Sequence, residues 1–242
     1  MSKLLIVQNS MIVQGVFKEQ LDIDGGFNYT LVQSLAGARN ALNLSRYEFA
    51  VVERTLSDAA DGKIIALLNK YNIAPLVFTK EIDEDFFESF EGARIVDYII
   101  QDKHYNVPKV IKKLNQLKQN KKSTVLVVND SHIYGTYLKQ NLNLHSFKVV
   151  SVSNNEDAIS KLALHPEIRL MVLEQSNPYV DAKKLIEAVK SDAKLEGLKI
   201  LIIAEESNSY ETAMLLNAGA DDYVVKQFSR AEFYVRIYQN IR

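Results

Sequence analysis

Residues 218–228 read AGADDYVVKQF, and this stretch decides how the rest of the chain is interpreted. Its glycine is typical of a turn that follows a helix end, and the run DYVV after it favours a short β-strand. A lysine then stands where the strand stops. We therefore interpret the stretch as a helix end, a turn, a strand and an exposed Lys226.

The sequence also contains an internal repeat. Three pairs of segments correspond at offsets between 121 and 125 positions: residues 4–10 (LLIVQNS) with 125–131 (VLVVNDS), 49–53 (FAVVE) with 170–174 (LMVLE), and 97–100 (DYII) with 222–225 (DYVV). Such a repeat predicts two homologous units in tandem. We expect one domain at residues 1–120 and a second at residues 121–242, each of ordinary domain size.

Each unit alternates short apolar, β-branched runs with helical patterns, which favours a parallel sheet covered by helices on both faces. Five strands and five helices in about 120 residues are typical of the α/β flavodoxin-like fold, a doubly wound (βα)5 sheet with strand order 2-1-3-4-5. The expected strands lie at residues 3–7, 28–32, 49–53, 74–78 and 95–100, and then at 124–128, 148–152, 170–173, 198–203 and 222–225.

The composition limits the classes of partner. Lys and Arg number 29 against 30 Asp and Glu, so no overall charge attracts the chain to nucleic acid or to a membrane surface. There is no Cys, and the four His show no spacing typical of metal ligands. No apolar run approaches the roughly 18 residues of a membrane span. We expect a cytoplasmic protein that contacts neither nucleic acid nor membrane.

Residues 107–123, at the junction of the two units, predict an amphipathic helix that packs on the first unit. The same segment carries six lysines. No aromatic side chain interleaves them, so a solvated helix face is favoured over a nucleic-acid or lipid patch.

The repeat and the stretch 218–228 resemble the receiver domains of two-component response regulators, whose last strand ends in a phosphate-sensing lysine. The resemblance covers essentially the whole chain. It implies five functional positions in each unit: two acids after the first strand, an Asp acceptor after the third, a hydroxyl after the fourth and a lysine after the fifth. In a working receiver they surround one Mg²⁺ ion and the phosphoryl group.

In the first unit the resemblance places these positions at Gln8, Asn9, Glu53, Thr79 and Gln101. Neutral amides replace the acidic pair, so no metal site is expected here. Glu53 stands at the acceptor position without a lysine partner, and we interpret it as a solvated or salt-bridged residue. The first unit is expected to be a receiver in shape only.

In the second unit the same positions fall at Asn129, Asp130, Glu174, Ala204 and Lys226. One acid and the lysine are kept, whereas Ala204 lacks the switch hydroxyl. Asp130 and Glu174 are weak candidates for a Mg²⁺ site, and no other cofactor is expected.

Two interpretations of Glu174 remain open. A Glu places its carboxylate about one methylene further out than an Asp, so a contact with Lys226 would hold an activated-like state without phosphate. The alternative is that the inherited pocket has decayed. A displaced carboxylate also spoils the in-line geometry of phosphoryl transfer. Glu205 and Glu206 add negative charge nearby, in a direction that the sequence leaves open.

Three further residues matter for the resemblance. Tyr98 and Tyr223 stand where receivers carry the aromatic side chain that couples the pocket to the output face, and the alternative for both is a half-buried strand aromatic. Gln227 replaces a proline that typically follows a cis peptide bond in receivers, so the loop geometry is expected to differ from the family's.

The fourth helix, fifth strand and fifth helix of the second unit are expected to form a contact face, because residues 218–237 resemble receivers of winged-helix transcription factors, which pair through this surface. This contact face would serve homodimerisation or the docking of a protein partner. Phe233 and Tyr234 would supply its apolar contacts, and its candidate charges are Asp221, Asp222, Arg230 and Arg236. In the alternative, the charges are solvated and the two aromatic side chains pack inward.

We therefore expect a non-catalytic module of two degenerate receivers that regulates an output domain or a partner by protein contacts, without aspartyl phosphorylation. Such pairs resemble the amino-terminal part of regulators whose output is a diguanylate cyclase, and no output domain is recognisable in this chain. Two alternatives remain: a second unit that binds Mg²⁺ and is regulated by phosphorylation, or a flavodoxin-like protein that binds a ligand such as flavin. The lack of a phosphate loop disfavours the last.

Overall fold

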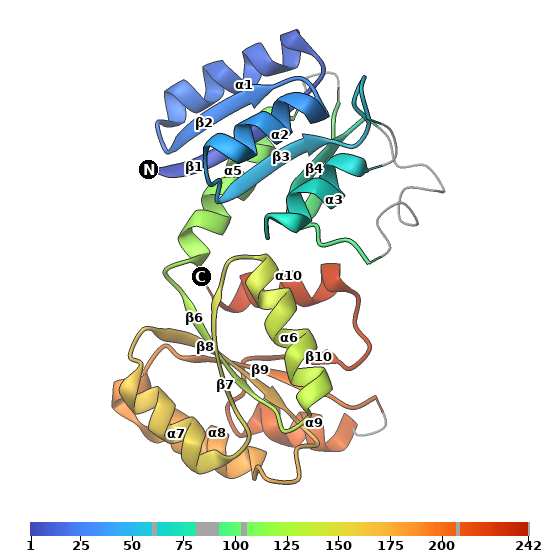
Figure 1. The fold of residues 1–242 in the computed structure, drawn as a ribbon. Coiled ribbons are helices and arrows are strands. Elements are labelled where there is room, and N and C mark those ends of the chain that lie inside the picture. Colours follow the sequence, from blue (N-terminus) through green and yellow to red (C-terminus); the bar gives the residue numbers. More distant parts are fainter. Residues whose placement is uncertain (60–61, 81–91, 103–105, 207–208, 242) are drawn as a thin grey trace. The chain divides into compact units, whose positions relative to one another are not determined.

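The computed structural model describes residues 1–59, 62–80, 92–102, 106–206 and 209–241 (Figure 1). The chain divides into two compact units, Met1–Lys118 and Gln119–Arg242. Within the described ranges, no helix combines the length and the apolar character needed to cross a membrane.

The first unit contains an all-parallel sheet of five strands in the order β2-β1-β3-β4-β5. Its strands are β1 (Ser2–Val7), β2 (Phe27–Val32), β3 (Phe49–Glu53), β4 (Leu76–Thr79) and β5 (Asp97–Ile100). Its helices are α1 (Met11–Asp24), α2 (Leu35–Leu44), α3 (Lys63–Lys70) and α5 (Val107–Asn120), the last of which ends inside the second unit.

The second unit repeats this sheet, with the order β7-β6-β8-β9-β10 and all strands parallel. The strands are β6 (Thr124–Val128), β7 (Lys148–Val152), β8 (Ile168–Glu174), β9 (Lys199–Ala204) and β10 (Asp222–Val225). The helices are α6 (His132–Leu144), α7 (Asn155–Leu164), α8 (Ala182–Ser191), α9 (Ser209–Asn217) and α10 (Arg230–Asn240), with a short 3₁₀ turn at Ala193–Leu195. Both sheets confirm the predicted flavodoxin-like class and strand order.

Each sheet separates two apolar cores, because successive strand residues point to opposite faces. In the first unit, Leu4 and Ile6 of β1 pack with α1 and α5, whereas Leu5 and Val7 pack with α2 and α3. In the second unit, α6 and α10 cover one face, and α7, α8 and α9 cover the other. Helices on both faces explain why the strands read as continuous apolar runs.

The bounds of six strands differ from the prediction by one or two residues at an end, namely those of β1, β2, β4, β5, β8 and β9, and two of these differences matter for the site. The strand expected at residues 74–78 begins only at Leu76, because Pro75 has no N–H to donate, although its carbonyl accepts from the Val96 N–H at 2.9 Å. The strand expected at 170–173 runs over Ile168–Glu174, so the last ladder residue is Glu174 itself.

Residues 218–228 form a turn followed by strand β10, as predicted. Gly219 has φ 117°, a conformation that favours glycine, and a Cβ there would lie 2.9 Å from Cγ of Lys190. The carboxylate of Asp221 accepts from Lys190 Nζ at 2.7 Å, from Lys199 Nζ at 2.8 Å and from the Ile200 N–H at 2.9 Å. These bonds fix the start of β10 beside β9.

Helix α5 packs on the first unit through one stripe of five buried residues, Val107, Val110, Ile111, Leu114 and Leu117, as predicted. Its lysine face is only partly solvated, which corrects the expectation for two residues. Lys113 pairs with Asp97 at 2.7 Å, and Lys118 donates to the Gly26 carbonyl at 2.7 Å. At the end of the helix, Asn120 Nδ2 donates to the His145 carbonyl at 2.7 Å and to the Tyr238 hydroxyl at 3.0 Å.

The stripe on α5 generates the first prediction. Leu114→Ala should lower the free energy of unfolding by about 2–5 kcal/mol, because Leu114 is fully buried and its loss leaves a cavity. Leu44→Ala, a change of the same chemistry at a side chain that is 86% exposed, is the matched control and should cost less than about 0.5 kcal/mol. Urea unfolding followed by circular dichroism measures both. Equal losses would show that α5 does not contribute to the core of the first unit.

Candidate functional site

The five predicted positions lie at the carboxyl ends of the strands in both units. Backbone hydrogen bonds place them equivalently: Gln101 N donates to the Thr79 carbonyl at 2.6 Å, and Lys226 N donates to the Ala204 carbonyl at 2.7 Å. Likewise Gln8 N donates to the Val32 carbonyl at 3.0 Å, and Asn129 N to the Val152 carbonyl at 2.9 Å. Carboxyl ends of parallel strands are where ligands bind in this fold.

In the first unit, amides take over the contacts at this edge. Gln8 is buried, and its Oε1 accepts from the Ser10 N–H at 3.1 Å, while its Nε2 finds no hydrogen-bond partner among the described residues. Asn9 N donates to Glu53 Oε2 at 3.1 Å. Glu53 is half-buried, and this backbone bond explains its position without a cation.

The loop after β3 is tied to its surroundings by further bonds. Asn9 Nδ2 donates to the Thr55 carbonyl at 2.8 Å, and Asn9 Oδ1 accepts from the Ser57 N–H at 3.0 Å. The carboxylate of Asp58 accepts from the N–H groups of Leu35 and Ala36 at 2.8 and 3.0 Å, at the start of α2. These backbone bonds lower the pKa of Asp58. Thr79 is buried, and Tyr98 and Gln101 are half-buried.

In the second unit, a lysine between two carboxylates replaces that amide arrangement. Lys226 Nζ donates to Glu174 Oε1 at 2.8 Å and to Glu205 Oε1 at 2.7 Å. The other oxygen of Glu174, Oε2, accepts a hydrogen bond from Asn129 Nδ2. The Glu174 side chain is only 5% exposed, so its charge is buried and compensated by Lys226.

Glu205 points into this cluster, which settles the direction that the sequence left open. Its Oε1 also accepts from Ser176 Oγ at 2.7 Å. The hydrogen bonds from Lys226 and Ser176 lower the pKa of Glu205, and the bonds to Glu174 and Glu205 raise the pKa of Lys226. Glu206 is exposed. Sequence reasoning missed Ser176, although its place two residues after the acceptor position was a usable signal.

The residues of the second unit do not fit a Mg²⁺ ion. Both oxygens of Glu174 are engaged, and the ammonium group of Lys226 already lies against that carboxylate. Asp130 is exposed and makes no hydrogen bond to another described residue. Across the described part of the chain, no group of three or more His, Cys, Asp or Glu side chains could hold a metal ion. Magnesium requires several oxygen ligands in nearly octahedral geometry.

Aromatic and backbone features around Lys226 also depart from the receiver pattern. The Lys226 ammonium lies 5.1 Å from the centre of the Tyr134 ring, and burial raises the pKa of the Tyr134 hydroxyl. Tyr223 is 40% exposed on β10.

The loop after β10 also differs from the receiver pattern. Gln227 has φ 74°, and none of the described peptide bonds is cis. The loop therefore follows a different course from the proline-containing one, as expected.

Phe233 and Tyr234 do not supply the exposed apolar contacts that were one of the two expectations for the contact face. Phe233 is buried in the core, and the Tyr234 hydroxyl donates to the Asn141 carbonyl at 3.0 Å, so these aromatic side chains pack inward. Two of the candidate charges, Arg236 and Asp222, pair with each other at 3.1 Å, and Asp221 is bound by Lys190 and Lys199. Arg230 remains exposed. The large apolar side chains that are exposed on β10 and α10 are Tyr223, Val225 and Val235.

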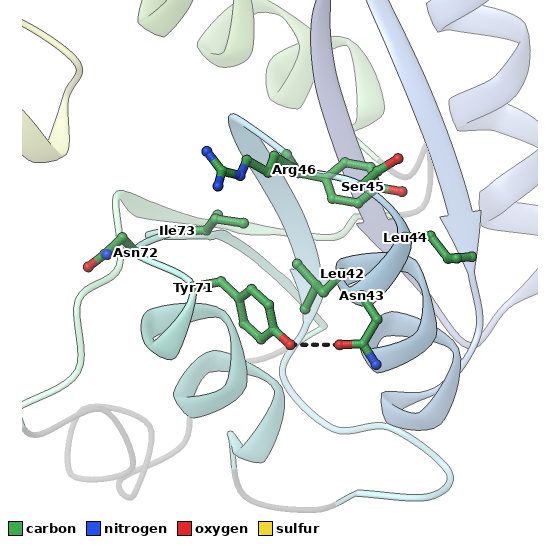
Figure 2. Close-up of a pocket in the computed structure, with 9 residues that line it drawn as sticks. Leu42, Asn43, Leu44, Ser45, Arg46, Tyr71, Asn72 and Ile73 are labelled. Carbon is green, nitrogen blue, oxygen red and sulfur yellow. Dashed lines mark hydrogen bonds between the residues drawn. The ribbon is translucent and has the colours of Figure 1, made fainter.

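A hollow of about 610 Å³ lies elsewhere in the first unit, where α2 and α3 end and before β3 and β4 begin. Figure 2 shows Arg46, Tyr71, Leu42 and Ile73 among the residues that line it, with the Tyr71 hydroxyl bonded to Asn43 Oδ1 at 3.0 Å. It therefore lies at the amino ends of these strands, away from the predicted functional positions.

Comparisons with known proteins agree with the fold and the repeat. The family model of the response regulator receiver domain matches residues 125–238. A crystal structure of a two-component system response regulator/GGDEF domain protein is similar over 99% of this chain and 98% of its own, with a TM-score of 0.83 and 26% identity.

Curated relatives match about one unit each. The chemotaxis protein CheY1 of Helicobacter pylori is 26% identical over 43% of this chain and 86% of its own length. The alkaline phosphatase synthesis regulator PhoP of Bacillus subtilis is 30% identical over 49% of this chain, which spans about half, 47%, of PhoP. Residues 125–238 thus match the response regulator receiver domain, and the whole chain has the fold of two receivers in tandem, similar to that regulator/GGDEF domain protein.

Proposed function

We propose that this chain is a non-catalytic signalling module that regulates an output domain or a protein partner by surface contacts, without aspartyl phosphorylation. The observation that carries the proposal is the Lys226 ammonium group, which binds the carboxylates of Glu174 and Glu205 together. In a working receiver, this lysine would instead meet a phosphoryl group that arrives on the acceptor.

The bound state of Glu174 supports the absence of phosphoryl transfer. Both oxygens of the buried Glu174 carboxylate accept hydrogen bonds, so an in-line phosphoryl donor could reach either oxygen only by displacing Asn129 or Lys226. Two carboxylates in the cluster also repel an incoming phosphoryl dianion, and the donor set does not fit the metal ion that would offset this charge. In the first unit, Gln8 and Asn9 supply no carboxylate, which supports the same conclusion.

The similarity to a regulator with a GGDEF domain supports a context of cyclic di-GMP signalling, in which this pair controls a separate output domain. The exposed side chains of Tyr223 and Val235 support a protein-contact role for the β10–α10 face, either in homodimers or with a partner. The absence of Cys supports a cytoplasmic location, and the nearly balanced charge disfavours nucleic acid as a partner.

Phosphorylation is the direct test. After incubation with acetyl phosphate and Mg²⁺, the intact mass of the protein should stay unchanged, while an active receiver treated in parallel gains one phosphoryl group. The reason is that Glu replaces the acceptor Asp in both units, and that neither unit offers the set of carboxylates that Mg²⁺ requires. A stoichiometric gain that disappears in Glu174→Gln would refute the proposal and favour a phospho-regulated second unit.

The bridge itself makes a second prediction. Lys226→Met should lower the free energy of unfolding by about 1–3 kcal/mol, because it leaves the buried Glu174 charge without its cation. Adding Glu174→Gln should recover part of that loss, with a coupling energy of about 1 kcal/mol or more. Lys184→Met, at a side chain that is 80% exposed, is the control and should be nearly neutral. Strictly additive losses in urea unfolding would mean that the bridge contributes no coupling.

The lowered pKa of Glu205 makes a third prediction. A carboxyl group whose pKa is lower in the folded state adds stability above its unfolded pKa, and that stability disappears as the pH falls through the folded value. Between about pH 5 and about pH 3, Glu205→Gln should therefore lose less stability than the wild type, by up to about 1 kcal/mol because solvent screens the partly exposed pair.

The matched control for this pH series is Glu187→Gln, which removes a carboxylate of a more exposed pair on α8. Its acid sensitivity should follow the wild type. Parallel pH profiles for Glu205→Gln and the wild type would contradict the prediction and would mean that the Glu205 contacts are equally strong in the unfolded chain.

A further inference from the structure

One buried amide in the second unit is not explained by the receiver pattern. Gln175 directly follows Glu174 and is 4% exposed. Its Oε1 accepts from the Glu205 N–H at 3.2 Å and from Thr212 Oγ1 at 2.9 Å, and its Nε2 donates to Glu211 Oε2 at 3.0 Å. One side chain thus joins the end of β8, the residue after β9 and the first turn of α9.

Gln175 and Ser176 hold Glu205 from two sides. The amide of Gln175 binds the backbone N–H of Glu205, and the hydroxyl of Ser176 binds its carboxylate. Since that carboxylate also binds Lys226, any change in the lysine bridge acts on the residue that Gln175 links to α9.

Helix α9 buries few of its side chains. Of its nine residues only Thr212 and Leu215 are buried, whereas Tyr210 is 83% exposed and Met214 is 37% exposed. A helix with one large buried apolar side chain gains little from packing, so buried hydrogen bonds weigh more in fixing its position. Thr212 is itself 5% exposed, which makes its bond to Gln175 costly to break.

The switch hydroxyl and the aromatic side chain that would couple the pocket to the surface in receivers do not make this connection here. Ala204 carries no hydroxyl, and Tyr223 lies on the exposed side of β10. We propose that Gln175 is the positioning residue that couples the Glu174–Lys226–Glu205 cluster to helix α9, in place of the switch hydroxyl and aromatic side chain. The inference deepens the proposed function, because it names how that site would control a surface that includes Tyr210 and Met214.

Hydrogen exchange on the full chain tests the coupling. In Gln175→Leu, amides of α9 should exchange at least about tenfold faster than in the wild type, while amides of α7 and of the first unit keep their rates. Thr212→Val should have the same local effect, and the double variant should add nothing further. Gln119→Leu, at an exposed glutamine, is the control and should leave α9 unchanged.

A swap of the hydrogen-bonding groups separates positioning from simple packing. Gln175→Glu places a second carboxylate against Glu211 and should release α9, whereas Gln175→Glu combined with Glu211→Gln restores a donor–acceptor pair and should return slow exchange. The proposal is overturned if α9 exchange in Gln175→Leu matches the wild type, if the whole second unit accelerates equally, or if the swap fails to rescue. A phosphoryl gain in the mass experiment would refute the proposed function without altering these exchange results.

Discussion

The ammonium group of Lys226 is the interaction on which the second unit's carboxyl-end architecture depends. It balances a buried carboxylate, Glu174, that would otherwise be an uncompensated charge at the end of a strand whose last five residues are all buried. The same ammonium turns Glu205 inward, and Glu205 in turn engages Ser176. A single cation therefore arranges three loops, those that follow β8, β9 and β10.

The two units reach a closed carboxyl end by different chemistry. In the first unit, Asn9 and Asp58 satisfy backbone groups of neighbouring loops and of α2, so neutral amides and one capping carboxylate suffice. In the second unit, Lys226 holds the loops together by neutralising the carboxylates of Glu174 and Glu205. Gln101 and Lys226 make equivalent backbone hydrogen bonds, so the same backbone forms with a neutral amide or with a lysine at this position. The apolar parallel strands supply the common framework, and the residues at their ends are free to diverge.

The sequence predicted the repeated strands and their order well, and it predicted the contacts of individual side chains less well. Periodicity and the internal repeat predicted the ten strands and their order, because buried parallel strands carry a strong apolar signal. The contact between Glu174 and Lys226 was foreseeable from the receiver resemblance alone. The inward turn of Glu205 was not, since a loop residue's rotamer depends on partners that come from other strands. Gln175 gave no signal either, because a polar residue after a strand is ordinary until its burial is known.

Helix α5 has a consequence for where the chain can be divided. Its apolar stripe belongs to the core of the first unit, whereas the amide of its last residue, Asn120, donates to the His145 carbonyl and to the Tyr238 hydroxyl. The residues after the stripe are therefore not a neutral linker. A second unit that is cut out after Asn120 would leave this buried carbonyl and hydroxyl without their amide donor.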